Sequence, residues 1–176
     1  MAFTTMFKVA PTLTQPGAGT EKKVYNFHHQ VRTFAGGGDA VDVMLLQALF
    51  RIFYYEFKFF GSIDPPSATT GIIKVDGIVG KQTRIHIDHF QQFLKRTKRS
   101  VTTDGIIDPF RKQGIDSPHT NQPFQLFSLN GLCLGMAIRL SREGVHQNMF
   151  DPAIHGDDIY PVKLRTAMSR PPVAMR

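Results

Sequence analysis

The chain has 176 residues, of which 41% are hydrophobic, so it can bury a sizeable core as one domain and leaves little room for a separate catalytic domain. Its net charge of +7 favours anionic partners such as nucleic acid, acidic lipid or a carboxylate-rich polymer, and does not choose among them. One cysteine, Cys133, excludes an intramolecular disulfide, and its apolar helical surroundings predict a buried thiol.

Residues 1–38 are predicted to form an extended arm. They contain prolines and a run of three glycines around one short β-prone piece, residues 23–27. The start of the chain has no basic segment followed by an apolar run, so we expect no cleavable signal of the Sec type. Any export to the cell envelope would then use a pathway other than Sec.

A helix is predicted from about residue 39, where Asp39 or Asp42 can cap the first turn. The stripe expected to face the core is Val43, Leu46, Phe50, Phe53 and Phe57. The opposite side is also apolar, so the helix is either buried on two sides or presents Tyr54 and Tyr55 to a partner. Charged residues interrupt the apolar run, and we therefore expect no membrane span.

The stretch from residue 75 to residue 91, VDGIVGKQTRIHIDHFQ, is predicted to be a tight turn followed by a helix. Asp76 can accept backbone hydrogen bonds and Gly77 permits a positive φ, so Ile78 is expected to point into the core. Gly80 allows a close backbone approach. The apolar face of the helix is Thr83, Ile87, Phe90 and Leu94. A second turn, Asp104-Gly105-Ile106, repeats the first.

These residues resemble the peptidoglycan-binding-domain-like family, a three-helix cell-wall module attached to many amidases and lysins. The family pattern is a helix with Leu-Gln, then Val-Asp-Gly-Ile-x-Gly-x-x-Thr, a helix ending in Phe-Gln, and a second Asp-Gly turn before a third helix. The matching residues are Leu46, Gln47, Val75, Asp76, Gly77, Ile78, Gly80, Thr83, Ile87, Phe90, Gln91, Asp104, Gly105, Ile106 and Pro109. The resemblance covers roughly residues 39–142. The chain departs from the pattern at His86, where the family has alanine, and at Asp108, where it has glycine.

The predicted fold is mainly α, with a three-helix core of this type, two Asp-Gly turns, irregular extended termini and one or two short strands. The expected parts are an N-terminal arm over residues 1–38, the helical domain over 39–144 and a proline-containing tail over 145–176. The third helix is expected around Leu129 and Cys133, after a loop with two prolines.

Catalytic and metal-binding patterns are weak. There is no glycine-rich phosphate loop, no Gly-x-Ser-x-Gly elbow and no CxxC pair. His155 with Asp157 and Asp158, or His86 with His89, could begin a metal site, but neither set has the third ligand at a suitable spacing. We expect no catalytic residue, no cofactor and no metal.

The resemblance implies a non-catalytic protein that binds peptidoglycan or its stem peptides. The candidate ligand-binding residues are Gln47, Tyr54, Tyr55, Arg84, His86 and Gln91. Asp76, Gly77, Gly80, Asp104 and Gly105 are expected to be structural turn residues.

The alternative is an assembly protein of a phage particle or a bacterial secretion system that reuses the fold, with the aromatic first helix and the terminal arms as protein interfaces. A peptidoglycan hydrolase and a nucleic-acid binder have less support, because neither a catalytic constellation nor a groove-reading motif is present. The location is left open between the cell envelope, a phage or secreted particle, and the cytoplasm.

Overall fold

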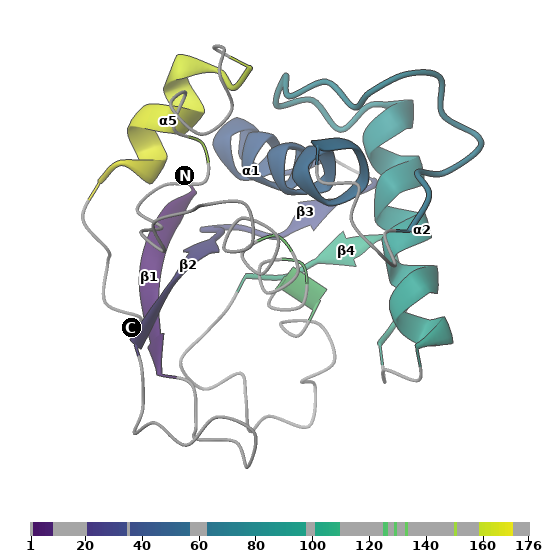
Figure 1. Cartoon of the computed structure of the whole chain (residues 1–176), viewed down its shortest axis with the longest axis horizontal. Coiled ribbons are helices and arrows are strands. Elements are labelled where there is room, and N and C mark those ends of the chain that lie inside the picture. Colours follow the sequence, from purple (N-terminus) through teal and green to yellow (C-terminus); the bar gives the residue numbers. More distant parts are fainter. Residues whose placement is uncertain are drawn as a thin grey trace.

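The structure is a computed structural model of the chain. It describes residues 2–8, 21–34, 36–56, 63–97, 101–109 and 159–170, together with Gln125, Leu126, Leu129, Cys133 and Phe150. Within these residues the protein is mainly helical, with two short antiparallel strand pairs. Figure 1 shows α2 running crosswise to α1, with α5 and β1 beyond the other end of α1.

The N-terminal segment contains strands, and part of it lies in the core. Strands β1 (Phe3–Lys8) and β2 (Glu21–Asn26) pair antiparallel, and β3 (Val31–Arg32) pairs antiparallel with β4 (Ile106–Ile107). Of the segment predicted as an extended arm, the side chains of Tyr25, Phe27 and Val31 are buried in the same cluster as the helices. The β3–β4 pair joins this segment to the second Asp-Gly turn.

Helix α1 (Ala40–Arg51) begins at Asp39, whose carboxylate accepts a hydrogen bond of 2.9 Å from the backbone N–H of Val41. Asp42 is buried and accepts the backbone N–H groups of His28 and His29 at 3.3 and 3.1 Å, which ties the preceding strand to the helix. The helix continues into a π-helix, η1 (Ile52–Glu56).

The aromatic first helix is buried on two sides. Its predicted stripe, Leu46, Phe50 and Phe53, and the opposite residues Leu45, Leu49 and Ile52 all lie in the core. Tyr54 is also buried, and Tyr55 is half-buried. Phe57, the last residue of the predicted stripe, lies outside the described residues.

Helix α2 (Lys81–Arg96) follows Gly80, and its predicted apolar face is confirmed, because Thr83, Ile87, Phe90 and Leu94 are all buried. The ring of Phe90 packs edge-on against Phe50 and Phe53, with centroid distances of 5.8 Å to each. These contacts join α2 to α1 and η1 through buried aromatic side chains.

A third helical segment and a C-terminal helix complete the core. Gln125, Leu126, Leu129 and Cys133 are helical and buried, and the Cys133 thiol donates to the Leu49 carbonyl oxygen at 3.3 Å. The buried thiol is therefore confirmed; other residues of the predicted third helix lie outside the described ones. Part of the predicted tail is instead a helix, α5 (Val162–Met168), which packs on α1 and β1. Its seven residues are too few to show helical periodicity in the sequence.

Candidate functional site

The first Asp-Gly turn is held by Gln47, a unit we call the first glutamine clasp (Gln47, Asp76, Gly77, Ile78 and Thr83). Gln47 is only 1% exposed. Its Oε1 accepts the backbone N–H groups of Asp76 and Gly77 at 3.0 and 2.9 Å. Its Nε2 lies 2.9 Å from Asp76 Oδ1, 2.9 Å from the Ile78 carbonyl oxygen and 3.0 Å from Thr83 Oγ1. Because backbone N–H groups only donate, they fix which end of the amide is the oxygen.

The second turn is held in the same way by Gln91, and this second glutamine clasp comprises Gln91, Asp104, Gly105, Ile106 and Gln125. Gln91 is 0% exposed, and its Oε1 accepts the Gly105 N–H at 3.0 Å. Its Nε2 donates to the Ile106 carbonyl oxygen and to Gln125 Oε1, both at 3.0 Å, and to Asp104 Oδ1 at 3.3 Å. The glycine has a φ of 75° here and 78° in the first clasp. The chain thus uses one structural unit twice.

The clasps explain three predicted residues. The amides of Gln47 and Gln91 are buried and bonded within the protein, so neither is available to a ligand in this structure. The prediction that Ile78 points into the core is wrong, since its side chain is 66% exposed. The Gln47 amide fills the inside of the turn, and Asp76 Oδ1 accepts the Ile78 N–H at 2.9 Å, which leaves the Ile78 side chain outside.

Two tyrosine–histidine pairs join η1 to α2. The hydroxyl of Tyr55 lies 2.8 Å from His86 Nε2, while His86 Nδ1 lies 2.8 Å from the Gln82 carbonyl oxygen. A carbonyl oxygen only accepts, so Nδ1 of His86 donates to it, and the neutral ring accepts from Tyr55 at Nε2. Burial lowers the pKa of His86, which favours this neutral form. The hydroxyl of Tyr54 makes the second pair with His89 Nδ1 at 2.9 Å.

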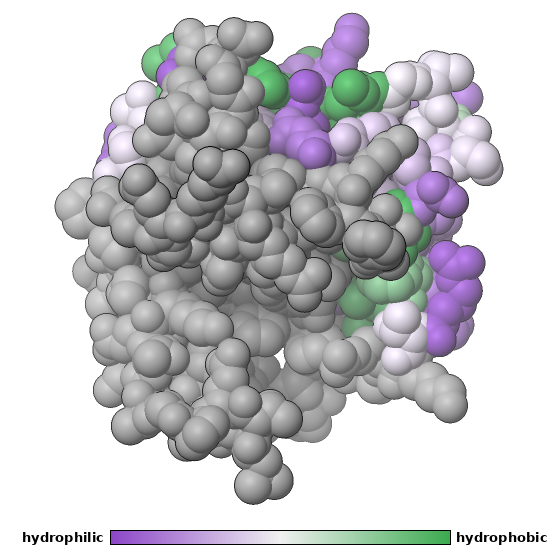
Figure 2. Space-filling view, in the orientation of Figure 1, coloured by the Kyte–Doolittle hydropathy of each residue, from purple (hydrophilic) through white to green (hydrophobic). Residues whose placement is uncertain are grey.

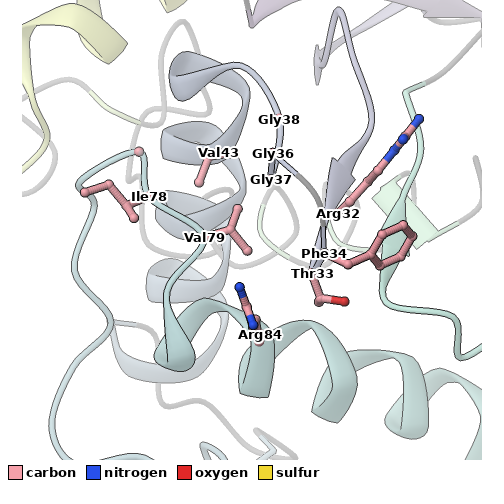
Figure 3. A pocket seen from close by; sticks show the side chains of 11 residues that line it. Arg32, Thr33, Phe34, Gly36, Gly37, Gly38, Val43, Ile78, Val79 and Arg84 are labelled. Carbon is pink, nitrogen blue, oxygen red and sulfur yellow. The ribbon is translucent and has the colours of Figure 1, made fainter.

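Arg84 is the predicted site residue that lies at an open hollow. This hollow, the Arg84 cleft, has a volume of about 310 Å³. Its lining residues are Arg32, Thr33, Phe34, Gly36, Gly37, Gly38, Val43, Gly77, Ile78, Val79 and Arg84. Figure 3 shows the Arg84 side chain extending from α2 towards Val79, while the Arg32 guanidinium points away from it. Arg32 Nε instead donates to Gln30 Oε1 at 2.9 Å.

The glycine run of residues 36–38 forms one wall of the Arg84 cleft. All three glycines have positive φ angles, and a Cβ at Gly37 would come within 2.9 Å of Val79 Cγ2, so only glycine allows this approach to the turn. Phe34 and Ile78, which are 49% and 66% exposed, add apolar surface. We had not predicted Phe34 or the glycines as site residues; the three consecutive glycines were the available signal.

The Arg84 guanidinium has no hydrogen-bond or ion-pair partner within the part of the chain that the structure describes. The cleft therefore offers a cation together with exposed apolar side chains. Of the six predicted ligand-binding residues, the structure brings Tyr54, Tyr55 and His86 together between η1 and α2, and places Gln47 and Gln91 in separate clasps.

The described residues contain no group of three His, Cys, Asp or Glu side chains that could hold a metal ion. His155, Asp157 and Asp158 lie outside them. No helix in the described ranges has the length and hydrophobicity of a membrane span. Comparisons of the chain with protein-family models, with curated proteins and with solved structures find no match.

Proposed function

We propose that this protein binds peptidoglycan without cleaving it, and that the Arg84 cleft takes a stem peptide. The observation that carries the proposal is the Arg84 guanidinium, which has no partner among the described residues and stands beside the exposed side chains of Phe34 and Ile78. A stem peptide offers carboxylates next to small apolar groups. A guanidinium can hold a carboxylate through two parallel hydrogen bonds.

The two glutamine clasps support the same proposal through the fold. In the proposed three-helix core, α1, α2 and the helical residues between 125 and 133 are the three helices, and the clasps are the turns between them. Thr83 of the first clasp directly precedes Arg84 on α2, and Gly77 and Ile78 of that clasp line the Arg84 cleft. The clasp thereby holds Arg84 and one wall of the cleft in a fixed relation.

Binding of a single stem peptide should be weak. An exposed ion pair contributes only about 0.2–1 kcal/mol, and hydrogen bonds to a charged group raise this to roughly 1.5–3 kcal/mol. A polymer that repeats the same group many times raises the apparent affinity by rebinding. Retention on intact sacculi is therefore the sensitive measurement, and it should weaken as salt is added.

The test is a pull-down on purified sacculi with the wild-type protein, Arg84→Ala and Lys95→Ala. Lys95 is an exposed cation on the same helix that does not line the Arg84 cleft, so its removal controls for net charge. We expect Arg84→Ala to lose about tenfold in retention and Lys95→Ala less than about twofold, with no soluble fragments released from the sacculi. No retention of the wild-type protein at physiological salt, or equal losses in both variants, would overturn the proposal.

A second candidate is an assembly protein of a phage particle or a secretion system. Among the residues that the structure describes, four exposed large apolar side chains favour it: Phe34, Ile72, Ile78 and Val162. The predicted interface on the aromatic helix has less support, because Phe50, Phe53 and Tyr54 are buried. Light scattering separates the two candidates, since concentration-dependent self-association without sacculus binding favours assembly, whereas a monomer retained on sacculi favours peptidoglycan binding.

A further inference from the structure

A second hollow lies beside α2 and shares no residue with the Arg84 cleft. This hollow, the His89 groove, has a volume of about 440 Å³ and is lined by Pro66, Ser67, Ala68, Ile85, Asp88, His89, Gln92 and Arg96. Its five residues from α2 recur every one, three or four positions and therefore form one stripe of the helix. Figure 2 shows hydrophilic side chains along the outer edge of α2, at the right of the view.

The buried hydroxyl of Tyr54 fixes the hydrogen bonding of His89. Tyr54 is 1% exposed, and its hydroxyl lies 2.9 Å from His89 Nδ1. A buried hydroxyl needs an acceptor for its proton, and a neutral imidazole accepts at the nitrogen that carries no hydrogen. Nδ1 of His89 is thus the acceptor, and the ring hydrogen is on Nε2. Burial and the positive charge of Arg96 both lower the pKa of His89, which keeps the ring neutral.

The charges of the His89 groove balance although the whole chain carries +7. Asp88 contributes a carboxylate and Arg96 a guanidinium, while the Gln92 amide both donates and accepts. Because these two charges offset each other, the groove offers a polyanion no net attraction, whereas a neutral ligand with hydroxyl and amide groups could use all of these side chains. The exposed Ala68 and the half-buried Ile85 add apolar surface against which the C–H face of a sugar ring can pack.

We propose that the His89 groove binds a neutral N-acetylated sugar, with the Nε2–H of His89 donating to a sugar oxygen and the Asp88 carboxylate accepting hydroxyl protons. The choice of sugar rests on the proposed function, because the glycan strand of peptidoglycan is built from such units. The glycan would then lie along the outer stripe of α2, and the stem peptide would reach the Arg84 cleft on the same helix.

The test is a titration of the full chain with a soluble trimer of N-acetylglucosamine, followed by amide chemical shifts. The variants are Asp88→Ala and Gln92→Ala, whose side chains are exposed and whose loss should leave the fold intact. Arg84→Ala is the matched control from the other hollow. We expect shifts in residues 85–96 and 66–68 at millimolar sugar, about tenfold weaker binding in Asp88→Ala, and unchanged binding in Arg84→Ala.

The outcomes separate this inference from the proposed function. Sugar binding at the His89 groove in a protein that sacculi do not retain supports the groove and overturns peptidoglycan binding. Retention on sacculi without chemical-shift changes at millimolar trimer would overturn the proposal that the His89 groove binds the sugar, and would leave the proposal for the Arg84 cleft unaffected. Shifts centred on the Arg84 cleft, or equal weakening in Asp88→Ala and Arg84→Ala, also overturn the groove as the sugar site.

Discussion

Replacement of Gln47 by leucine removes the polar centre of the first glutamine clasp and nearly conserves the volume of the side chain. Leucine neither donates nor accepts. The Asp76 and Gly77 N–H groups lose their acceptor, and the Ile78 carbonyl oxygen and Thr83 Oγ1 lose a donor. Thr83 Oγ1 keeps its bond of 3.2 Å to the Ile78 carbonyl, so that carbonyl is not left empty.

The magnitude follows from how many of these groups water can reach. A polar group left unsatisfied in the interior costs about 1–3 kcal/mol. The Asp76 and Ile78 side chains are exposed, so water can hydrate part of the turn, while the Thr83 side chain is buried. The Asp76 and Gly77 N–H groups are counted at the lower end of this range and Thr83 Oγ1 near its middle, which gives roughly 4 kcal/mol. Against a total stability of about 5–15 kcal/mol, this loss is large.

Urea unfolding followed by far-UV circular dichroism measures the loss. Gln91→Leu should also destabilise the protein, because the Gly105 N–H would lose its acceptor and the Ile106 carbonyl oxygen and Gln125 Oε1 would lose a donor. Gln92→Leu is the matched control: it makes the same chemical change one residue later on the exposed side of α2 and should shift the free energy of unfolding by no more than about 0.5 kcal/mol. If Gln47→Leu costs less than about 1 kcal/mol, the clasp does not hold the turn as argued.

Three further perturbations test other parts of the structure. Gly77→Ala should destabilise the protein by more than about 2 kcal/mol, because its Cβ would lie 2.8 Å from the Ala40 carbonyl oxygen. Gly71→Ala, at a similar positive φ but in open space, should cost only about 1 kcal/mol. Equal midpoints of the two variants in thermal unfolding would contradict this. Burial holds the pKa of His86 below its ordinary value of 6.5, so the unfolded chain takes up a proton that the folded protein does not. The free energy of unfolding should therefore be unaffected by His86 above pH 6.5 and should decrease as the pH is lowered below it, by up to about 1.4 kcal/mol per pH unit. A urea midpoint that stays constant down to about pH 5 would argue against this. Burial also raises the pKa of the Cys133 thiol, which should react with a thiol reagent only in denaturant; rapid labelling in buffer would show that the thiol is accessible.

The parts of the fold that the sequence predicts are those with local signals. The face of α2 has helical spacing over four residues, and all four are buried. The turns were predicted from Asp-Gly dipeptides, and both glycines have the positive φ that such turns require. Helix α5 and strand β1 were not predicted, because a seven-residue helix and a six-residue strand depend on tertiary packing more than on a pattern of their own.

The candidate site was harder to predict because its residue types are ambiguous. A glutamine on an apolar helix can bind a ligand or satisfy a buried turn, and the sequence alone does not separate these roles for Gln47 or Gln91. One signal was present: each glutamine precedes an Asp-Gly-Ile turn, so the repeat includes the glutamine as well as the turn. Burial of both amides then assigns them to the turns. Arg84 differs because a charged side chain outside the apolar face of a helix is expected to be exposed, and Arg84 is exposed in the structure.

Helix α2 contributes to both clasps, Thr83 in its first turn and Gln91 towards its end. Each clasp bonds the helix to a turn from a different part of the chain, so rotation of α2 about its axis would break hydrogen bonds at two places. Arg84 directly follows Thr83, and His89 lies two residues before Gln91. The clasps therefore set the direction in which both candidate binding residues face. Gln47 and Gln91 would act on ligand binding as positioning residues, through the orientation of α2 and without touching the ligand.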